Sequence, residues 1–102
     1  MKRTLVRYRT KPDRTDENQR LIESVFQELR LKAPPGVRYA VLKLADGTFF
    51  HFAAAEDGGS GNPIVTLEAF RTFQSGVKDR CIEAPQAVEP TVIGNYRMLD
   101  EQ

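Results

Sequence analysis

Tryptophan is absent from the 102-residue sequence, and cysteine and histidine occur once each, as Cys81 and His51. A single thiol excludes an internal disulfide, and an unpaired cysteine is typical of a reducing compartment, so we expect a cytoplasmic protein. One histidine, one cysteine and scattered carboxylates give no metal-ligand spacing. The glycine-rich DGGSG at 57–61 lacks the Lys-Ser/Thr of a phosphate loop. We therefore expect no flavin, haem or metal in the purified protein.

The sequence also has little excess charge and no long apolar run. It has 15 basic and 14 acidic residues, so no overall electrostatic field attracts nucleic acid or an anionic membrane surface. Charges interrupt the apolar residues of the N-terminal MKRTLVRYRTK, and we expect neither a signal peptide nor a membrane span. The length fits one soluble domain, 1–102, with a modest core.

The N-terminal part of the chain predicts a strand followed by a helix. Residues 2–10, KRTLVRYRT, alternate with the period of two that is typical of a strand. The segment 12–36 predicts a helix with Asp13 or Thr15 as N-cap and Pro34-Pro35-Gly36 at its end. The apolar stripe of this helix consists of Leu21, Ile22, Val25, Phe26 and Leu29.

A β-hairpin is expected over residues 37–56, because Asp46-Gly47 tolerates the positive φ angles of a two-residue type I′ turn. This turn pairs Leu42 with His51. The expected pairing assigns each side chain of the hairpin to one of the two sheet faces. One face has Arg38, Ala40, Leu42, Leu44, Phe49, His51 and Ala53, and the other has Tyr39, Val41, Lys43, Phe50, Phe52 and Ala54.

A second helix and a last strand complete the pattern. The segment 65–81 predicts a helix with Thr66 as N-cap. The segment 87–99 is rich in β-branched and aromatic residues, and Pro90 near its start suits an edge strand. The inward face of the second helix is expected to carry Leu67, Phe70, Phe73, Val77 and Cys81.

The order β-α-β-β-α-β predicts an α+β, ferredoxin-like fold, in which two helices cover one face of a four-stranded antiparallel sheet. Two helices leave the other face uncovered. That face is expected to be apolar, since Leu5, Ala40 and Leu42 fall on it. An apolar patch of this kind usually marks an interaction site, and a two-fold contact is the commonest solution. We therefore expect a homodimer formed by sheet-to-sheet packing.

Three stretches resemble the dimeric α/β-barrel proteins related to antibiotic-biosynthesis monooxygenases: YRTKPDRTDE at 8–17, the hairpin, and FFHFAAAED at 49–57. The resemblance implies a barrel formed by two sheets and a small aromatic or hydrophobic ligand between sheet and helices. The sequence has Ala55 where the family usually has tryptophan and Ala53 where glutamate is common. The segment 65–81 lacks the histidine that some members carry.

His51 is the candidate catalytic residue. Its predicted face also holds Arg38 and, by strand parity, Arg7 and Arg9, so an imidazole beside guanidinium groups could stabilise an anionic, phenol-like ligand. The favoured structural alternative is a buried histidine at the dimer seam with its nitrogens hydrogen-bonded. The candidate ligand-binding residues are Arg7, Arg38, Leu42, Phe49, Phe70, Phe73 and Tyr96.

Three functions stay open at this point. The first is a cofactor-independent, monooxygenase-like enzyme or a binder of a small aromatic or hydrophobic ligand. The second is a non-catalytic interaction or regulatory domain, since fold analogy alone does not decide activity. The third is an RNA-binding module, because DGTFFHF at 46–52 is superficially similar to an aromatic RNA-contacting strand. Nucleic acid is the least favoured partner, given the near-neutral charge.

Overall fold

The computed structural model of the chain describes residues 2–55 and 62–99. Four antiparallel strands form one sheet in the order β2-β3-β1-β4, and the predicted α+β, ferredoxin-like fold is confirmed. The strands are β1 (Lys2–Thr10), β2 (Val37–Lys43), β3 (Thr48–Ala55) and β4 (Cys81–Val88); the helices are η1 (Pro12–Arg14), α1 (Thr15–Lys32), η2 (Pro63–Thr66), α2 (Glu68–Ser75) and α3 (Val77–Arg80).

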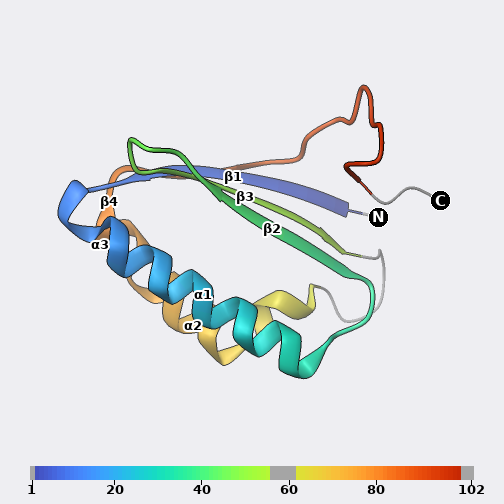
Figure 1. Ribbon diagram of the computed structural model, residues 1–102, viewed down its shortest axis with the longest axis horizontal. Helices are drawn as coiled ribbons and strands as arrows, with labels where there is room; N and C mark the ends of the chain where they lie inside the picture. The colour runs from blue at the N-terminus through green and yellow to red at the C-terminus, as the bar shows by residue number, and fades with distance from the viewer. Residues whose placement is uncertain (1, 56–61, 100–102) are drawn as a thin grey trace.

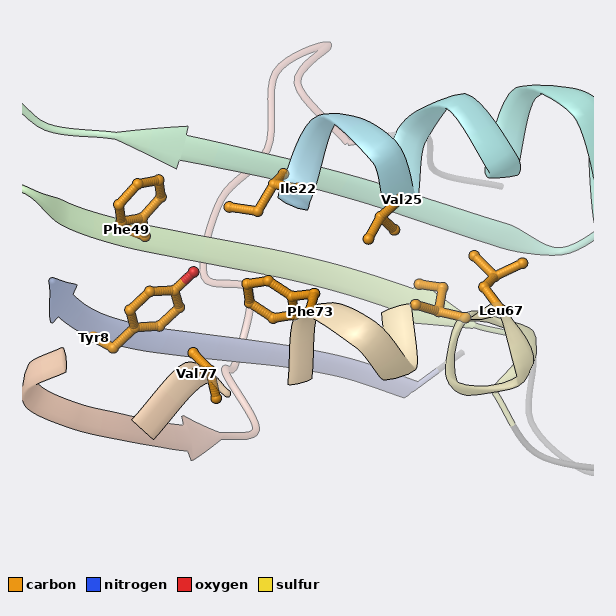
Figure 2. Packing of buried hydrophobic residues seen from close by; sticks show 8 residues of the cluster. Tyr8, Ile22, Val25, Phe49, Leu67, Phe73 and Val77 are labelled. Atoms are coloured by element: carbon orange, nitrogen blue, oxygen red, sulfur yellow. The ribbon is translucent and has the colours of Figure 1, made fainter. Parts of the chain in front are cut away.

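The helices lie on one side of the sheet, and residues 89–99, which follow β4, run along the other side (Figure 1). The core fills the space between the sheet and the helices. Figure 2 shows Tyr8 of β1 and Phe49 of β3 pointing from the sheet toward Ile22 and Val25 of α1 and Phe73 of α2. No helix within the described residues is long and apolar enough to cross a membrane.

Helix α1 follows the sequence prediction except at its start. The predicted stripe lies against the core, with Ile22 and Val25 buried. Neither predicted N-cap is correct: Asp13 lies in η1, and Thr15 is already the first residue of α1, preceded by Arg14 without a side-chain cap. The helix ends where predicted, because Ala33 turns to a positive φ of 43° and its N–H donates to the carbonyl of Leu29.

The predicted hairpin register is wrong by one residue. Strand β2 pairs Val41 with His51 and Lys43 with Phe49. A type I′ turn needs positive φ at both Asp46 and Gly47, but only Gly47 has one, at 88°. The amide of Leu44 donates to the carbonyl of Thr48, and the turn therefore has three residues with the glycine in the left-handed region.

A one-residue slip moves every side chain of β2 to the opposite face of the sheet. His51 consequently shares the helix-covered inner face with Tyr39 and Val41 of β2 and with Val6 and Tyr8 of β1. The prediction that His51, Phe49 and Ala53 lie on the uncovered face is wrong. Leu5, Ala40 and Leu42 do lie on the outer face, which no helix of the described residues covers, as predicted. They are joined there by Phe50, Phe52 and Val88, and by the arginines Arg7 and Arg38.

The second predicted helix is divided. Helix α2 ends before Gly76, and α3 follows as a separate turn. The predicted Thr66 N-cap is wrong, because Thr66 closes η2 and its hydroxyl donates to the carbonyl of Pro63. The carboxylate of Glu28 on α1 takes the capping role and accepts the amide of Ala69 at 2.9 Å.

The predicted last strand at 87–99 is also wrong, since β4 spans Cys81–Val88 and the segment 89–99 has no helix or strand. Strand β4 is an edge strand, as expected. Its ladder with β1 shifts register between the pairs Arg7–Gln86 and Arg9–Glu83. Pro85, which has no N–H to donate, falls at this irregularity.

The outer face is as apolar as the sequence indicates, although its members differ. Leu42 is 63 % exposed, and Phe50 and Phe52 are only partly covered. On the same side of the sheet, the segment after β4 exposes Ile93 and Met98 (Figure 1). A second copy placed face to face would cover both sets of apolar groups, and such obligate interfaces bury on the order of 2,000 Å² or more.

We therefore expect a homodimer in solution, measured by light scattering at micromolar concentration. In Leu42→Asp, a charge enters the apolar outer face, and the dimer should dissociate into folded monomers, because Leu42 is exposed within the single chain. The matched control is Leu31→Asp, at an 87 % exposed position of α1, which should stay dimeric. A monomeric parent protein, or a dimeric Leu42→Asp variant, would contradict the sheet-to-sheet arrangement.

Gly47 should be required for the hairpin turn. Its φ is positive, and a Cβ built there would lie 3.2 Å from the Thr10 hydroxyl oxygen. Gly47→Ala should lower the free energy of unfolding by about 1–2 kcal/mol, measured by chemical denaturation. The control is Gly94→Ala, where an added Cβ meets no atom within 4 Å. Equal stability of both variants would argue against the three-residue turn.

Candidate functional site

A cavity of about 230 Å³ lies between the inner face of the sheet and the α2 side of the helical layer. Its walls come from β1, β2, β3, η2, α2, α3 and β4, and most of them are apolar. We call it the site cavity. Its lining includes Val6, Ala53, Ile64, Phe70, Phe73 and Val77, together with the polar rings of Tyr8, Tyr39 and His51.

His51 lies between two tyrosines on the neighbouring strands. The Tyr8 hydroxyl is 2.8 Å from Nε2 of His51, and the Tyr39 hydroxyl is 2.7 Å from Nδ1. Since β3 lies between β1 and β2, each tyrosine approaches the imidazole from one side. Both ring nitrogens are therefore hydrogen-bonded, as expected of a buried polar group.

The hydrogen bonds continue from Tyr8 into the helices. The Asn18 side-chain amide of α1 donates from Nδ2 to the Tyr8 hydroxyl at 2.9 Å. Arg80, only 2 % exposed at the end of α3, donates from Nε to Oδ1 of Asn18 at 2.9 Å and from Nη2 to the Phe73 carbonyl at 2.8 Å. One continuous chain of hydrogen bonds thus joins Arg80, Asn18, Tyr8, His51 and Tyr39.

Burial sets the protonation of these groups. Desolvation lowers the pKa of His51 to about 4, so its imidazole is neutral at neutral pH. Desolvation also raises the pKa of Tyr8 and of Tyr39 well above the usual value. The two phenols therefore stay protonated, and the only formal charge among the five groups is the guanidinium of Arg80.

Aromatic packing holds the polar rings in place. The ring of Phe73 lies 5.4 Å from that of His51 and 5.3 Å from the Arg80 guanidinium carbon. Tyr39 stacks on Phe26 with centroids 5.0 Å apart, which fixes the direction of its hydroxyl. The polar atoms of the cavity thus sit on rings with little freedom to move.

The predicted site residues separate into three groups. His51, Phe70 and Phe73 line the site cavity together. Phe49 is buried in the core beside Tyr8 but lines a different surface hollow. The remaining four, which are Arg7, Arg38, Leu42 and Tyr96, lie away from His51.

The expectation that Arg7, Arg38 and Leu42 share a face with His51 is wrong. Arg7 and Leu42 both pair with Phe50, and Arg38 pairs with Ala54, so all three lie on the outer face. Tyr96 lies in the exposed segment after β4. Arg7 pairs with Glu83 at 2.6 Å.

Sequence reasoning misses four polar members of the site: Tyr8, Asn18, Tyr39 and Arg80. It places Tyr8 and Tyr39 on the face opposite His51. The three-residue turn around Gly47 is the signal that identifies Tyr39, because it alone puts Tyr39 on the His51 face. Asn18 carries a weaker signal: it falls on the apolar side of α1, one turn before Ile22.

The described residues contain no group of three His, Cys, Asp or Glu side chains that could hold a metal ion. Cys81 begins β4 rather than ending a helix, and it packs against the core. Burial raises the pKa of its thiol, which is consistent with the predicted role of a small core residue.

Comparison with solved structures supports the fold. A protein from Nitrosomonas europaea, provisionally named an antibiotic biosynthesis monooxygenase, is similar with a TM-score of 0.73 and 21% identity over 92% of this chain and 100% of that one. One from Bacteroides thetaiotaomicron with the same provisional name gives 0.76 and 13% over 99% and 95%. A conserved protein from Methanosarcina mazei Go1 gives 0.68 and 18% over 84% and 86%. No protein-family model and no curated protein matches the chain.

Burial of His51 should make stability depend on pH in a defined window. Its pKa is about 4 in the folded chain, below the ordinary value of 6.5 that applies to the unfolded chain. Between these two values, the unfolded chain binds a proton at His51 and the folded chain does not. The free energy of unfolding should fall by about 2 kcal/mol per chain between pH 7 and pH 5. Denaturant titrations at fixed protein concentration measure it. A flat profile over this window would contradict the burial of a neutral His51, the only histidine of the chain.

Proposed function

We propose that the protein binds a small aromatic or hydrophobic compound in the site cavity, and that it does so as a monooxygenase-like protein without a bound cofactor. The observation that carries the proposal is the cavity itself: apolar walls around one row of hydrogen-bonded polar rings, Tyr8, His51 and Tyr39. Ligand sites of this kind combine an apolar enclosure with a few placed polar groups. The volume suits a compound of one or two rings.

The names of the structures with similar folds suggest oxygenation as the reaction class. Such a reaction takes dioxygen as the oxidant, and it needs a group that stabilises a substrate anion able to reduce it. In this chain, the polar side of the cavity offers neutral hydrogen-bonding rings. A purely binding or regulatory role uses the same cavity and the same groups.

A second candidate uses the outer face. Phe50 and Phe52 stand two residues apart on β3 beside Arg7 and Arg38, and exposed aromatic rings with arginines can stack single-stranded RNA. A dimer would cover this face. Strand β1 supplies aliphatic Leu5 there, and Arg7 is paired with Glu83, so we favour the second copy as the occupant.

A thermal-shift screen separates these functions, because binding stabilises the folded state as ln(1 + [L]/Kd). Phenols, ring ketones and fatty acids test the cavity, and single-stranded RNA tests the outer face. We expect stabilisation by ring compounds. Stabilisation by RNA that fades with salt would favour the second candidate, and no response to any class would leave an interaction domain as the better account.

Filling the cavity provides the matched variant. Ala53→Met places a longer apolar side chain into the lining of the site cavity and should abolish stabilisation by ring compounds while the protein remains folded. The control is Ala84→Met, at an exposed position of β4, which should bind like the parent. Undiminished binding in Ala53→Met would locate the ligand elsewhere and contradict the proposal.

A further inference from the structure

The direction of every hydrogen bond in the buried chain of polar groups can be deduced from Arg80. A guanidinium has only donors, so Arg80 Nε donates to Asn18 and the accepting atom is the Oδ1 oxygen. The other end of the Asn18 amide is then its NH₂ group, which donates to the Tyr8 hydroxyl at 2.9 Å. Arginine thereby fixes the orientation of the asparagine.

The Tyr8 hydroxyl must in turn donate to His51. It accepts from Asn18, and within the described residues its other partner is Nε2 of His51, 2.8 Å away. If Nε2 carried a proton, the buried Tyr8 hydroxyl would accept twice and its own proton would have no acceptor there, at a cost of about 1–3 kcal/mol. Nε2 is therefore the acceptor.

A neutral imidazole with an accepting Nε2 carries its proton on Nδ1. Nδ1 consequently donates to the Tyr39 oxygen at 2.7 Å. Tyr39 then accepts from His51 and has its own hydroxyl proton left to donate, and its side chain lines the site cavity. All five groups donate in the same direction, from Arg80 toward the cavity.

We infer that the Tyr39 hydroxyl is the hydrogen-bond donor that the site cavity presents to its ligand, and that the ligand carries an acceptor oxygen, such as a ring ketone or a phenolate. This inference rests on the proposed function. The neutral state of His51, set by burial, agrees with it. A chain of aligned donors that starts at a cation also strengthens its last bond.

The same direction assigns His51 a positioning role. Both of its nitrogens are engaged, and the groups behind Nε2 end in Asn18 and Arg80, which accept no proton from the chain. His51 therefore acts through Tyr39, by holding the phenol oxygen and polarising its O–H. The site therefore selects a ligand that accepts a hydrogen bond from the Tyr39 hydroxyl.

The tautomer is tested first, in ligand-free protein, by ¹⁵N–¹H correlation of the imidazole. The protein has one histidine, so assignment is unambiguous. We expect the Nδ1–H tautomer at pH 7. An Nε2–H tautomer reverses the direction of the hydrogen bonds and overturns the inference, whatever the protein binds.

Ligand selectivity is tested with 1-tetralone and tetralin, which share a ring skeleton and differ in one carbonyl oxygen. We expect 1-tetralone to bind more tightly, and Tyr39→Phe to weaken its binding about tenfold without changing that of tetralin. Tyr96→Phe, which removes an exposed hydroxyl, is the control. In addition, the infrared carbonyl stretch of bound 1-tetralone in the parent protein should lie below its value in an apolar solvent.

The outcomes separate the two proposals. If Tyr39→Phe weakens the binding of 1-tetralone and of tetralin equally, the substitution has altered the packing of the cavity. The carbonyl stretch of 1-tetralone bound to the parent protein then decides, and an unshifted stretch overturns the inference. Unchanged binding of 1-tetralone by a folded Tyr39→Phe variant overturns it as well. Failure of both compounds to bind the parent protein contradicts the proposed function and the ligand class with it, while the tautomer still decides the direction of the hydrogen bonds.

Discussion

The burial of His51 between two tyrosines is the constraint on which the rest of the structure depends. His51 is only 6 % exposed, so each of its ring nitrogens needs a hydrogen-bond partner within the protein. Tyr8 and Tyr39 satisfy them from the two neighbouring strands. A one-residue slip of either strand would turn a phenol to the outer face and leave a buried nitrogen unpaired. The triad therefore fixes the alignment of the three strands β1, β2 and β3.

The same polar groups tie the helices to the sheet. Asn18 of α1 and Arg80 of α3 are both buried, and each would be costly alone. Together they satisfy one another, and Arg80 also donates to the carbonyl of Phe73 on α2. Apolar packing alone tolerates small shifts of a helix over a sheet, whereas this set of hydrogen bonds allows one position. The cavity beside it thus has a defined polar wall.

Much of the fold follows from the sequence, because helix periodicity and the stop at Pro34 are strong local signals. The hairpin register does not follow. Asp46-Gly47 suits both a two-residue turn and a three-residue turn with glycine last, and only long-range pairing distinguishes them. Since the face of His51 depends on that one residue, sequence reasoning assembles most of the site wrongly. It names Phe70 and Phe73 as candidates together with His51, but it puts His51 on the face away from the helices and Tyr39 on the face opposite His51. The apolar segment 91–93 suits a strand by composition, yet β1 is already paired on both edges.

Strand β3 links the two faces of the molecule. His51 and Ala53 line the site cavity on the inner face, and Phe50 and Phe52 alternate with them on the outer face. This alternation explains why the strand is apolar on both sides: one side lines the site cavity beneath the helices, and the other forms the apolar outer face that we propose a second copy covers. Because the proposed ligand and the proposed second copy would approach from opposite sides of one sheet, dimer formation would leave the cavity in place. Strands β1 and β2 alternate in the same way, with Val6 and Tyr39 at the cavity and Leu5 and Ala40 on the outer face, so any coupling between the two sides would pass through the sheet.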